Sequence, residues 1–318
     1  MLKTTLAALI FGACFTGHAF AANSDPDDEA LNSCLKSQHR STPEEEFSLF
    51  YRLQSRAPTV MSNVKRIYYG KKLDQYGDLR LPPGQGPFPV AIVVHGGNWL
   101  AVVNSDYMAP VAEILTNSGF ATWNIEYSRI GSGGGWPGSF QSIAAATDFV
   151  RDLAKIYPLD LNRVMSIGHS SGGHYALWMA SRKNIRELSE VFVPNPLQLK
   201  GAIALDGSPD IDAFGKLPRG KVIIPQLIGS TEPAVISERM RDISPTLLLP
   251  TGGKIFIISQ DSDRAPMQRE YVRNANAKGD RAAYDIICPA NHFTTADTEN
   301  PVVREKIIRY SHEVIDAR

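Results

Sequence analysis

Residues 168–172 read Gly-His-Ser-Ser-Gly and follow a short apolar run at residues 163–167. This fits the G-x-S-x-G pattern, in which a tight turn between a strand and a helix presents the middle serine as a nucleophile. Glycines on both sides let the strand and the helix pack closely around the turn. We therefore predict that Ser170 is the nucleophile and that the backbone N–H of Ser171 helps to bind an oxyanion. A plain glycine-serine turn gives the same five letters, so other motifs must decide.

A second glycine-containing motif, residues 95–99 (HGGNW), follows the apolar run 90–94. Glycines allow the backbone to turn its amides towards a substrate, which is how an oxyanion hole is built. We expect Gly97 and Asn98 to supply two of these N–H groups. His95 is interpreted as a structural loop histidine, because the chain offers a better base.

That base is His292, which follows the last predicted strand in the stretch PANHF. A general base must be held by an acid, and the acid is expected after the preceding strand, in the stretch SQDSDRAP. Asp261 and Asp263 both lie there. Serine, then acid, then histidine is a known chain order for a catalytic triad.

Short apolar runs alternate with amphipathic helical stretches through most of the chain, which predicts an α/β fold with a mainly parallel sheet covered on both faces. The expected strands are residues 89–95, 121–127, 163–168, 201–206, 254–260 and 283–288. The expected helices are residues 107–118, 139–157, 171–182, 268–277 and 302–315. In such a fold the loops after the strands meet at one edge of the sheet, where the candidate residues would converge.

The stretches GHSSGGHYALWMA, HGGNW and NHF together resemble the α/β-hydrolase superfamily, in particular its esterase and arylformamidase-like branch with an HGGxW oxyanion loop. The resemblance runs from about residue 60 to the C-terminus. It implies a serine hydrolase that needs no metal and no cofactor. The family often has H-G-x-x-D after the acid strand, and this chain departs from it; by that spacing Asp263 is the better match and Asp261 the alternative. Should both fail, Asp206 and Asp210 are next.

The implied activity is hydrolysis of small or medium carboxylic esters through an acyl-enzyme on Ser170. The alternatives are an amide hydrolase of the arylformamidase type, a peptidase, and a catalytically silent α/β-hydrolase domain that binds protein. Trp99 and Trp136 are candidates for the pocket wall, with core packing as the alternative for each.

Residues 1–21 have the character of a secretory signal peptide, with cleavage expected after Ala21. Residues 22–60 are expected to form an N-terminal extension that contains a helix at residues 43–54 and packs on the hydrolase domain, residues 61–318. Residues 206–250, rich in proline and glycine, are a possible cap insertion.

The 33 basic and 33 acidic residues balance, which gives no reason to expect a nucleic-acid partner. The expected partner is a small ester, with no stable membrane insertion, and the sequence leaves the oligomeric state open. Export predicts a periplasmic or secreted protein in an oxidising compartment. There Cys34 could pair with Cys288, with two free thiols as the alternative.

Overall fold

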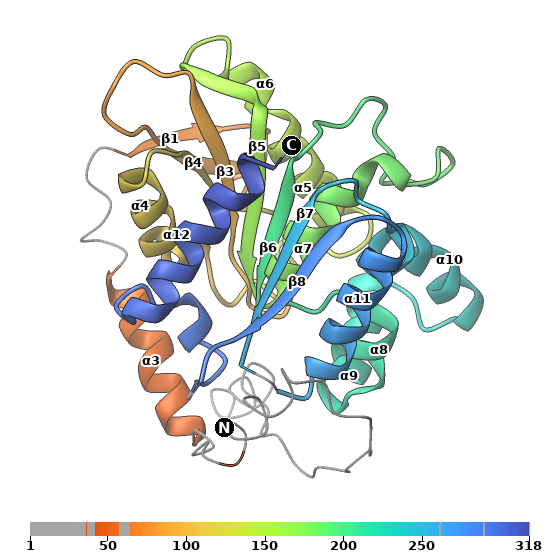
Figure 1. Ribbon diagram of the computed structural model, residues 1–318. Helices are drawn as coiled ribbons and strands as arrows, with labels where there is room; N and C mark the ends of the chain where they lie inside the picture. Colours follow the sequence, from red (N-terminus) through yellow and green to blue (C-terminus); the bar gives the residue numbers. More distant parts are fainter. Residues whose placement is uncertain (1–35, 37–41, 57–63, 261, 289, 318) are drawn as a thin grey trace.

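A computed structural model describes residues 36, 42–56, 64–260, 262–288 and 290–317. Its centre is an eight-stranded sheet in the order β1-β2-β4-β3-β5-β6-β7-β8 (Figure 1). The neighbours β1/β2 and β2/β4 are antiparallel, and every other pair from β4 to β8 is parallel. The strands are β1 (Lys65–Tyr68), β2 (Tyr76–Arg80), β3 (Phe88–Val94), β4 (Ala121–Ile125), β5 (Leu159–His169), β6 (Gly201–Leu205), β7 (Lys254–Ser259) and β8 (Arg281–Ile286).

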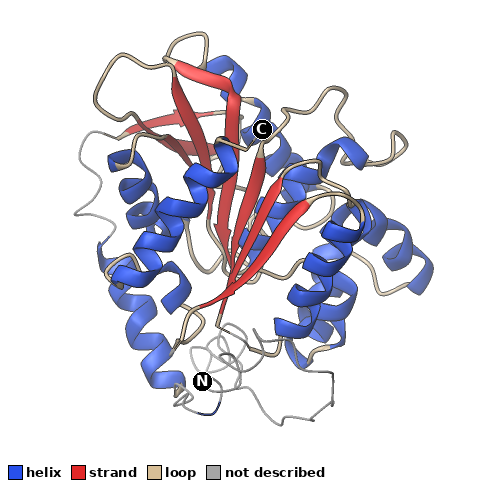
Figure 2. Cartoon of the chain, in the orientation of Figure 1, coloured by secondary structure: helices blue, strands red, loops and turns tan. Residues whose placement is uncertain are grey.

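Helices cover both faces of the sheet (Figure 2). They are α3 (Pro43–Arg56), α4 (Ala109–Asn117), α5 (Gly138–Asp148), α6 (Val150–Leu153), α7 (Ser171–Ser181), α8 (Ile211–Lys216), α9 (Pro218–Ile228), α10 (Pro233–Ile243), α11 (Ala265–Ala277) and α12 (Pro301–Ile315). The predicted α/β fold with a mainly parallel sheet is confirmed, and each of the six expected strands and five expected helices is present. The antiparallel strands β1 and β2 were missed.

The two apolar cores follow from the side-chain alternation along a strand. In β3, Val90 and Ile92 enter the core shared with α5, α7 and α11, whereas Ala91 and Val93 enter the core shared with α4 and α12. Because both faces are buried, the strand must be apolar along its whole length, which is why it reads as a continuous run.

Helix α3 confirms the helix expected in the N-terminal extension. Its first turn is acidic, and Thr42 and Glu45 form a capping box: the Thr42 N–H donates to Oε2 of Glu45 at 2.8 Å, and the Glu45 N–H donates to Oγ1 of Thr42 at 3.3 Å. Phe50 and Leu53 are buried against the core that contains α4 and α12. An ion pair between Arg52 and Asp297, at 2.6 Å, adds to this attachment.

Residues 206–250, expected as a possible cap insertion, contain the short helices α8, α9 and α10 between β6 and β7. Among the described residues, no helix is long and apolar enough to cross a membrane. The expected signal peptide lies outside the described residues.

Candidate active site

Ser170 lies in the turn between β5 and α7 and has a φ of +58°, a backbone conformation that residues other than glycine rarely adopt. The turn is as tight as the glycine pattern predicts. A Cβ on Gly168 would lie 2.2 Å from the carbonyl oxygen of Gly172, and a Cβ on Gly172 would lie 2.3 Å from that of Val94. Only glycine fits at these two positions, so the spacing of the motif reports the close approach of strand, helix and neighbouring strand.

The loop after β3 has left-handed backbone at three successive residues, Gly97, Asn98 and Trp99, with φ of +112°, +53° and +60°. It is held to the start of α7, because the Trp99 N–H donates to Oγ of Ser171 at 3.2 Å. Gly97 and Asn98 line the same pocket as Ser170. Ser171 is the first residue of α7, where backbone N–H groups point outwards from the helix and favour negative charge.

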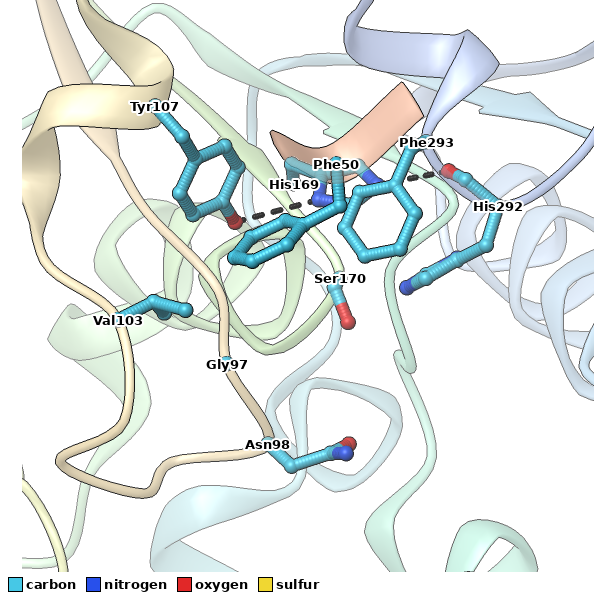
Figure 3. Close-up of a pocket in the computed structure, with 9 residues that line it drawn as sticks. All are labelled: Phe50, Gly97, Asn98, Val103, Tyr107, His169, Ser170, His292 and Phe293. Atoms are coloured by element: carbon cyan, nitrogen blue, oxygen red, sulfur yellow. Dashed lines mark hydrogen bonds between the residues drawn. The ribbon is translucent and has the colours of Figure 1, made fainter. Parts of the chain in front are cut away.

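His292 follows β8 and lines the pocket with Ser170, and both side chains point into it in Figure 3. Its Nδ1 lies 2.7 Å from Oδ2 of Asp206, which directly follows β6. A carboxylate in this position holds the proton on Nδ1 and presents Nε2 as a proton acceptor.

Asp206, and not Asp263, is therefore the acid that the structure places against the histidine. This corrects the preference for Asp263, which is exposed in the turn before α11. The alternative, Asp261, lies outside the described residues. The chain order of serine, acid and histidine still holds, because β6 also lies between them in sequence. The physical reason is that β6 is the immediate neighbour of β5, so the residue after β6 emerges beside the serine turn.

Asp206 is fully buried and receives hydrogen bonds on both oxygens. Besides His292, the amide of Gln268 donates to Oδ1 at 3.2 Å and a guanidinium N–H of Arg264 donates to Oδ2 at 2.9 Å. Burial alone would raise the pKa of Asp206. The charge of Arg264 and the hydrogen bond with His292 outweigh it and hold the pKa well below its usual value. The carboxyl group is thus an anion at any pH at which the protein would work.

A buried hydrogen-bond chain joins the oxyanion loop to the histidine loop, and the sequence interpretation missed it. The Gly96 N–H donates to the Tyr107 hydroxyl, which lies 3.2 Å from Nδ1 of His169. Nε2 of His169 lies 2.8 Å from the carbonyl oxygen of His292 (Figure 3). Because a carbonyl only accepts, Nε2 carries the proton and Nδ1 accepts from Tyr107. Burial lowers the pKa of His169 to about 4, so the ring stays neutral in this role.

The pocket above Ser170 is narrow, with a cavity volume of about 10 Å³, and its walls are mainly apolar. They come from three separate parts of the chain: Phe50 on α3, Val103 and Tyr107 after the oxyanion loop, and Phe293 beside the histidine. Phe50 contacts both of the other aromatic rings, with centroids 6.1 Å from Tyr107 and 5.1 Å from Phe293. Helix α3 thus contributes to the pocket, whereas the sequence predicted only that this extension packs on the hydrolase domain.

The two tryptophans expected as candidates for the wall lie elsewhere. Trp99 is buried in the core, where its indole N–H donates to Nδ1 of His174 at 3.2 Å. Trp136 donates to Glu190 at 2.8 Å, near the start of α5. Neither is among the described residues that line the pocket. The alternative of core packing is correct for Trp99.

His95 has a structural role, as interpreted. Its ring is buried, lies 2.9 Å from a carboxylate oxygen of Glu126 and stacks on Tyr127 at 4.5 Å. Glu126 in turn accepts from the backbone N–H of Ser105 at 3.2 Å. Glu126 thus ties His95, at the start of the oxyanion loop, to Ser105 after that loop.

Cys288, four residues before His292, is disulfide-bonded. Both other cysteines, Cys14 and Cys34, lie outside the described residues. The predicted pairing with Cys34 therefore stays a prediction. In the described part of the chain, no three side chains of His, Cys, Asp or Glu converge as a metal site would require.

The parallel sheet, the strained serine after β5 and the histidine after β8 define the fold of the α/β-hydrolases, with a serine-hydrolase type of site. The chain matches the family model BD-FAE over residues 78–265, more than half of its length, and belongs to that family.

Solved structures agree on the fold. The chain superposes on a structure titled "Truncated form of carbohydrate esterase from gut microbiota" with a TM-score of 0.67, 18% identity, and coverage of 79% of this chain and 95% of that one. It superposes on Esterase B from Lactobacillus rhamnosis with a TM-score of 0.70, 15% identity, and coverage of 92% and 97%.

Among curated proteins, the non-reducing polyketide synthase ausA of Penicillium brasilianum is 29% identical over 150 residues, which are 42% of this chain. The chain spans only 6% of the length of that relative.

Proposed function

We propose that this protein is a serine carboxylic-ester hydrolase that acts on small or medium esters through an acyl-enzyme on Ser170. The observation that carries the proposal is the contact between His292 and the buried, ionised Asp206 beside the pocket into which Ser170 points. The esterase titles of the two superposed structures support the reaction class.

In the first half of the reaction, Nε2 of His292 takes the proton of the Ser170 hydroxyl while Oγ attacks the ester carbonyl. The carbonyl oxygen becomes an oxyanion and accepts hydrogen bonds from the backbone N–H groups of Gly97, Asn98 and Ser171. Collapse of the tetrahedral intermediate breaks the bond to the alcohol, which takes the proton from the imidazolium. Ser170 is left as an acyl ester.

In the second half, water replaces the alcohol. His292 accepts a proton from the water, the hydroxide attacks the acyl carbonyl, and the same amides hold the second oxyanion. The acid product leaves as Oγ of Ser170 recovers its proton. Asp206 keeps the imidazole in the required tautomer in both halves and stabilises the imidazolium that forms.

The test is labelling with a fluorophosphonate probe together with hydrolysis of p-nitrophenyl esters and matched anilides. We expect covalent labelling at Ser170 and turnover of the esters. Turnover of anilides in preference to esters would instead favour the amide hydrolase. A folded protein that neither labels nor turns over any member of the panel would be a silent binding domain.

We further propose that the protein is exported after removal of residues 1–21. The disulfide at Cys288 supports this, because disulfides persist in oxidising compartments. N-terminal sequencing of the protein from its producing cells should begin at Ala22. An N-terminus that retains Met1 would refute export by this route.

A further inference from the structure

Arg264 contacts both the acid and the base of the site, Asp206 and His292. One guanidinium nitrogen of Arg264 is 2.9 Å from Oδ2 of Asp206 and also 2.9 Å from Nδ1 of His292. Arg264 precedes α11, and its side chain is almost fully buried, with 4% exposed. A cation so placed contacts both the base, which gains and loses a positive charge during catalysis, and the carboxylate that stabilises that charge.

The protons decide which contact is a hydrogen bond. When Nδ1 of His292 donates to Asp206, as general-base catalysis requires, this nitrogen cannot also accept from Arg264. The guanidinium N–H therefore donates to Oδ2 of Asp206, and towards the imidazole it acts as a fixed positive charge. The carboxylate is then held from two directions by donors on different elements.

The charges around the imidazole oppose one another. In the described part of the chain, Asp206 after β6 favours the imidazolium and Arg264 disfavours it. The ring of His169, the last residue of β5, lies 4.6 Å from that of His292 and is neutral. Glu46 on α3 interacts with Arg264, Arg219 and Asp206, and burial raises the pKa of its carboxyl group, which weakens it as a counter-anion. Asp263, beside Arg264 in sequence, is exposed. Among the residues that the structure describes, Arg264 is thus the cation in direct contact with the base.

We propose that Arg264 is a positioning residue that fixes the Asp206 carboxylate and keeps His292 unprotonated in acid, so that the hydrolase works at more acidic pH than a triad without the cation. The proposal rests on the proposed function of the site. In agreement with this geometry, the pKa of His292 is well below its ordinary value of 6.5. Burial of the ring is the largest cause, followed by Arg264 and then His169, and Asp206 acts in the opposite direction.

The experiment is a pH profile of kcat/KM on a p-nitrophenyl ester for the wild type, Arg264→Gln and Arg264→Lys. Removing the cation should move the midpoint of the acid limb upwards by about 1 to 2 pH units, the shift typical of one charge in contact with a titrating group. The lysine variant keeps the charge and should restore a midpoint closer to that of the wild type.

Arg182→Gln is the matched control, because Arg182 is also buried and pairs with an aspartate, Asp148, away from the site. It should lower stability without moving the midpoint. An Arg264→Gln enzyme whose rate falls equally at every pH, with an unmoved midpoint, would reduce Arg264 to a structural role and overturn the proposal.

Two further outcomes are separable. Should Arg264→Gln not fold, Arg264→Lys and the wild type still test the proposal, since a wild-type midpoint at or above 6.5, or a lysine variant whose midpoint rises by the full shift of about 1 to 2 pH units, would contradict it. A wild type that neither hydrolyses esters nor labels with the fluorophosphonate would refute the proposed function itself, before Arg264 is tested.

Discussion

The two halves of the site are built by different physical means. The serine half consists of the loop after β3 and the turn after β5. It is built by backbone geometry, with residues in left-handed conformation and glycines at positions that have no room for a Cβ. The histidine half, made of the loops after β6, β7 and β8, is held by side chains: a buried carboxylate, a guanidinium and two amides. Each motif of the first half is contiguous in sequence, whereas the second half is assembled from single side chains on different loops and depends on their charges.

The chain of Gly96, Tyr107 and His169 joins these halves, since it runs from the oxyanion loop to the carbonyl of His292. His169 remains neutral until the pH approaches about 4, because burial lowers its pKa to that value. We therefore expect mild acid to act on the site through His292.

The largest effect should come from the serine half. Ser170→Ala removes the covalent route and should cost roughly 10⁶ in turnover, as loss of a triad serine does elsewhere. Circular dichroism should show an intact fold, and the fluorophosphonate should no longer label the protein. A variant with more than about a tenth of wild-type activity would mean that another residue is the nucleophile, since the residual rate of a true triad mutant is far lower.

The next effect tests the acid in the histidine half. Asp206→Asn should cost about 10⁴ in kcat, because an amide favours the wrong imidazole tautomer. Asp263→Asn is the matched control and should stay close to the wild type, since this side chain is exposed. Thermal melts of both variants separate lost turnover from lost folding. Equal, small losses at both positions would remove Asp206 from the triad.

The same contrast explains what the sequence could predict. The turn at Ser170 and the loop at Gly97 are contiguous motifs, and their glycines are required by close packing, so both can be predicted from the sequence. The strands and helices can be predicted for a similar reason, because burial on one or both faces sets the period of the apolar residues.

Asp206 and Arg264 could not be predicted from the sequence in this way. Asp206 follows β6 and Arg264 follows β7. The amino-acid sequence does not show which carboxylate points towards His292. The turn at residues 260–264 offers two aspartates at a plausible spacing, yet the described side chains that reach Asp206 from that turn are those of Gln260 and Arg264. Phe50 was missed because a helical pattern predicts that a face is buried and does not say which part of the domain it covers.

A moderate effect concerns the disulfide at Cys288, which lies at the base of the loop carrying His292. If Cys34 is the partner, Cys34→Ser and Cys288→Ser should each lower the free energy of unfolding by about 2 to 5 kcal/mol, as loss of a native disulfide typically does. Denaturant unfolding of the proposed mature protein, which begins at Ala22 and so lacks Cys14, measures it. Loss of stability in Cys288→Ser and not in Cys34→Ser would show that Cys34 is not the partner.

The smallest effect should come from the wall of the pocket that spans both halves. Phe50 on α3 contacts Tyr107 on the serine side and Phe293 on the histidine side, so its ring limits the space in the pocket that contains Ser170. Phe50→Ala should raise kcat/KM for a hexanoyl relative to an acetyl p-nitrophenyl ester by roughly tenfold, the scale of discrimination that apolar pocket contacts provide. Tyr51→Ala is the control, since Tyr51 is the next residue on the helix and 63% exposed. Because both esters share one leaving group, a changed ratio reports the acyl side alone, and a melting temperature confirms that α3 remains attached. An unchanged ratio in Phe50→Ala, or the same change in Tyr51→Ala, would show that α3 does not set the acyl length and that the two halves of the site alone shape the pocket.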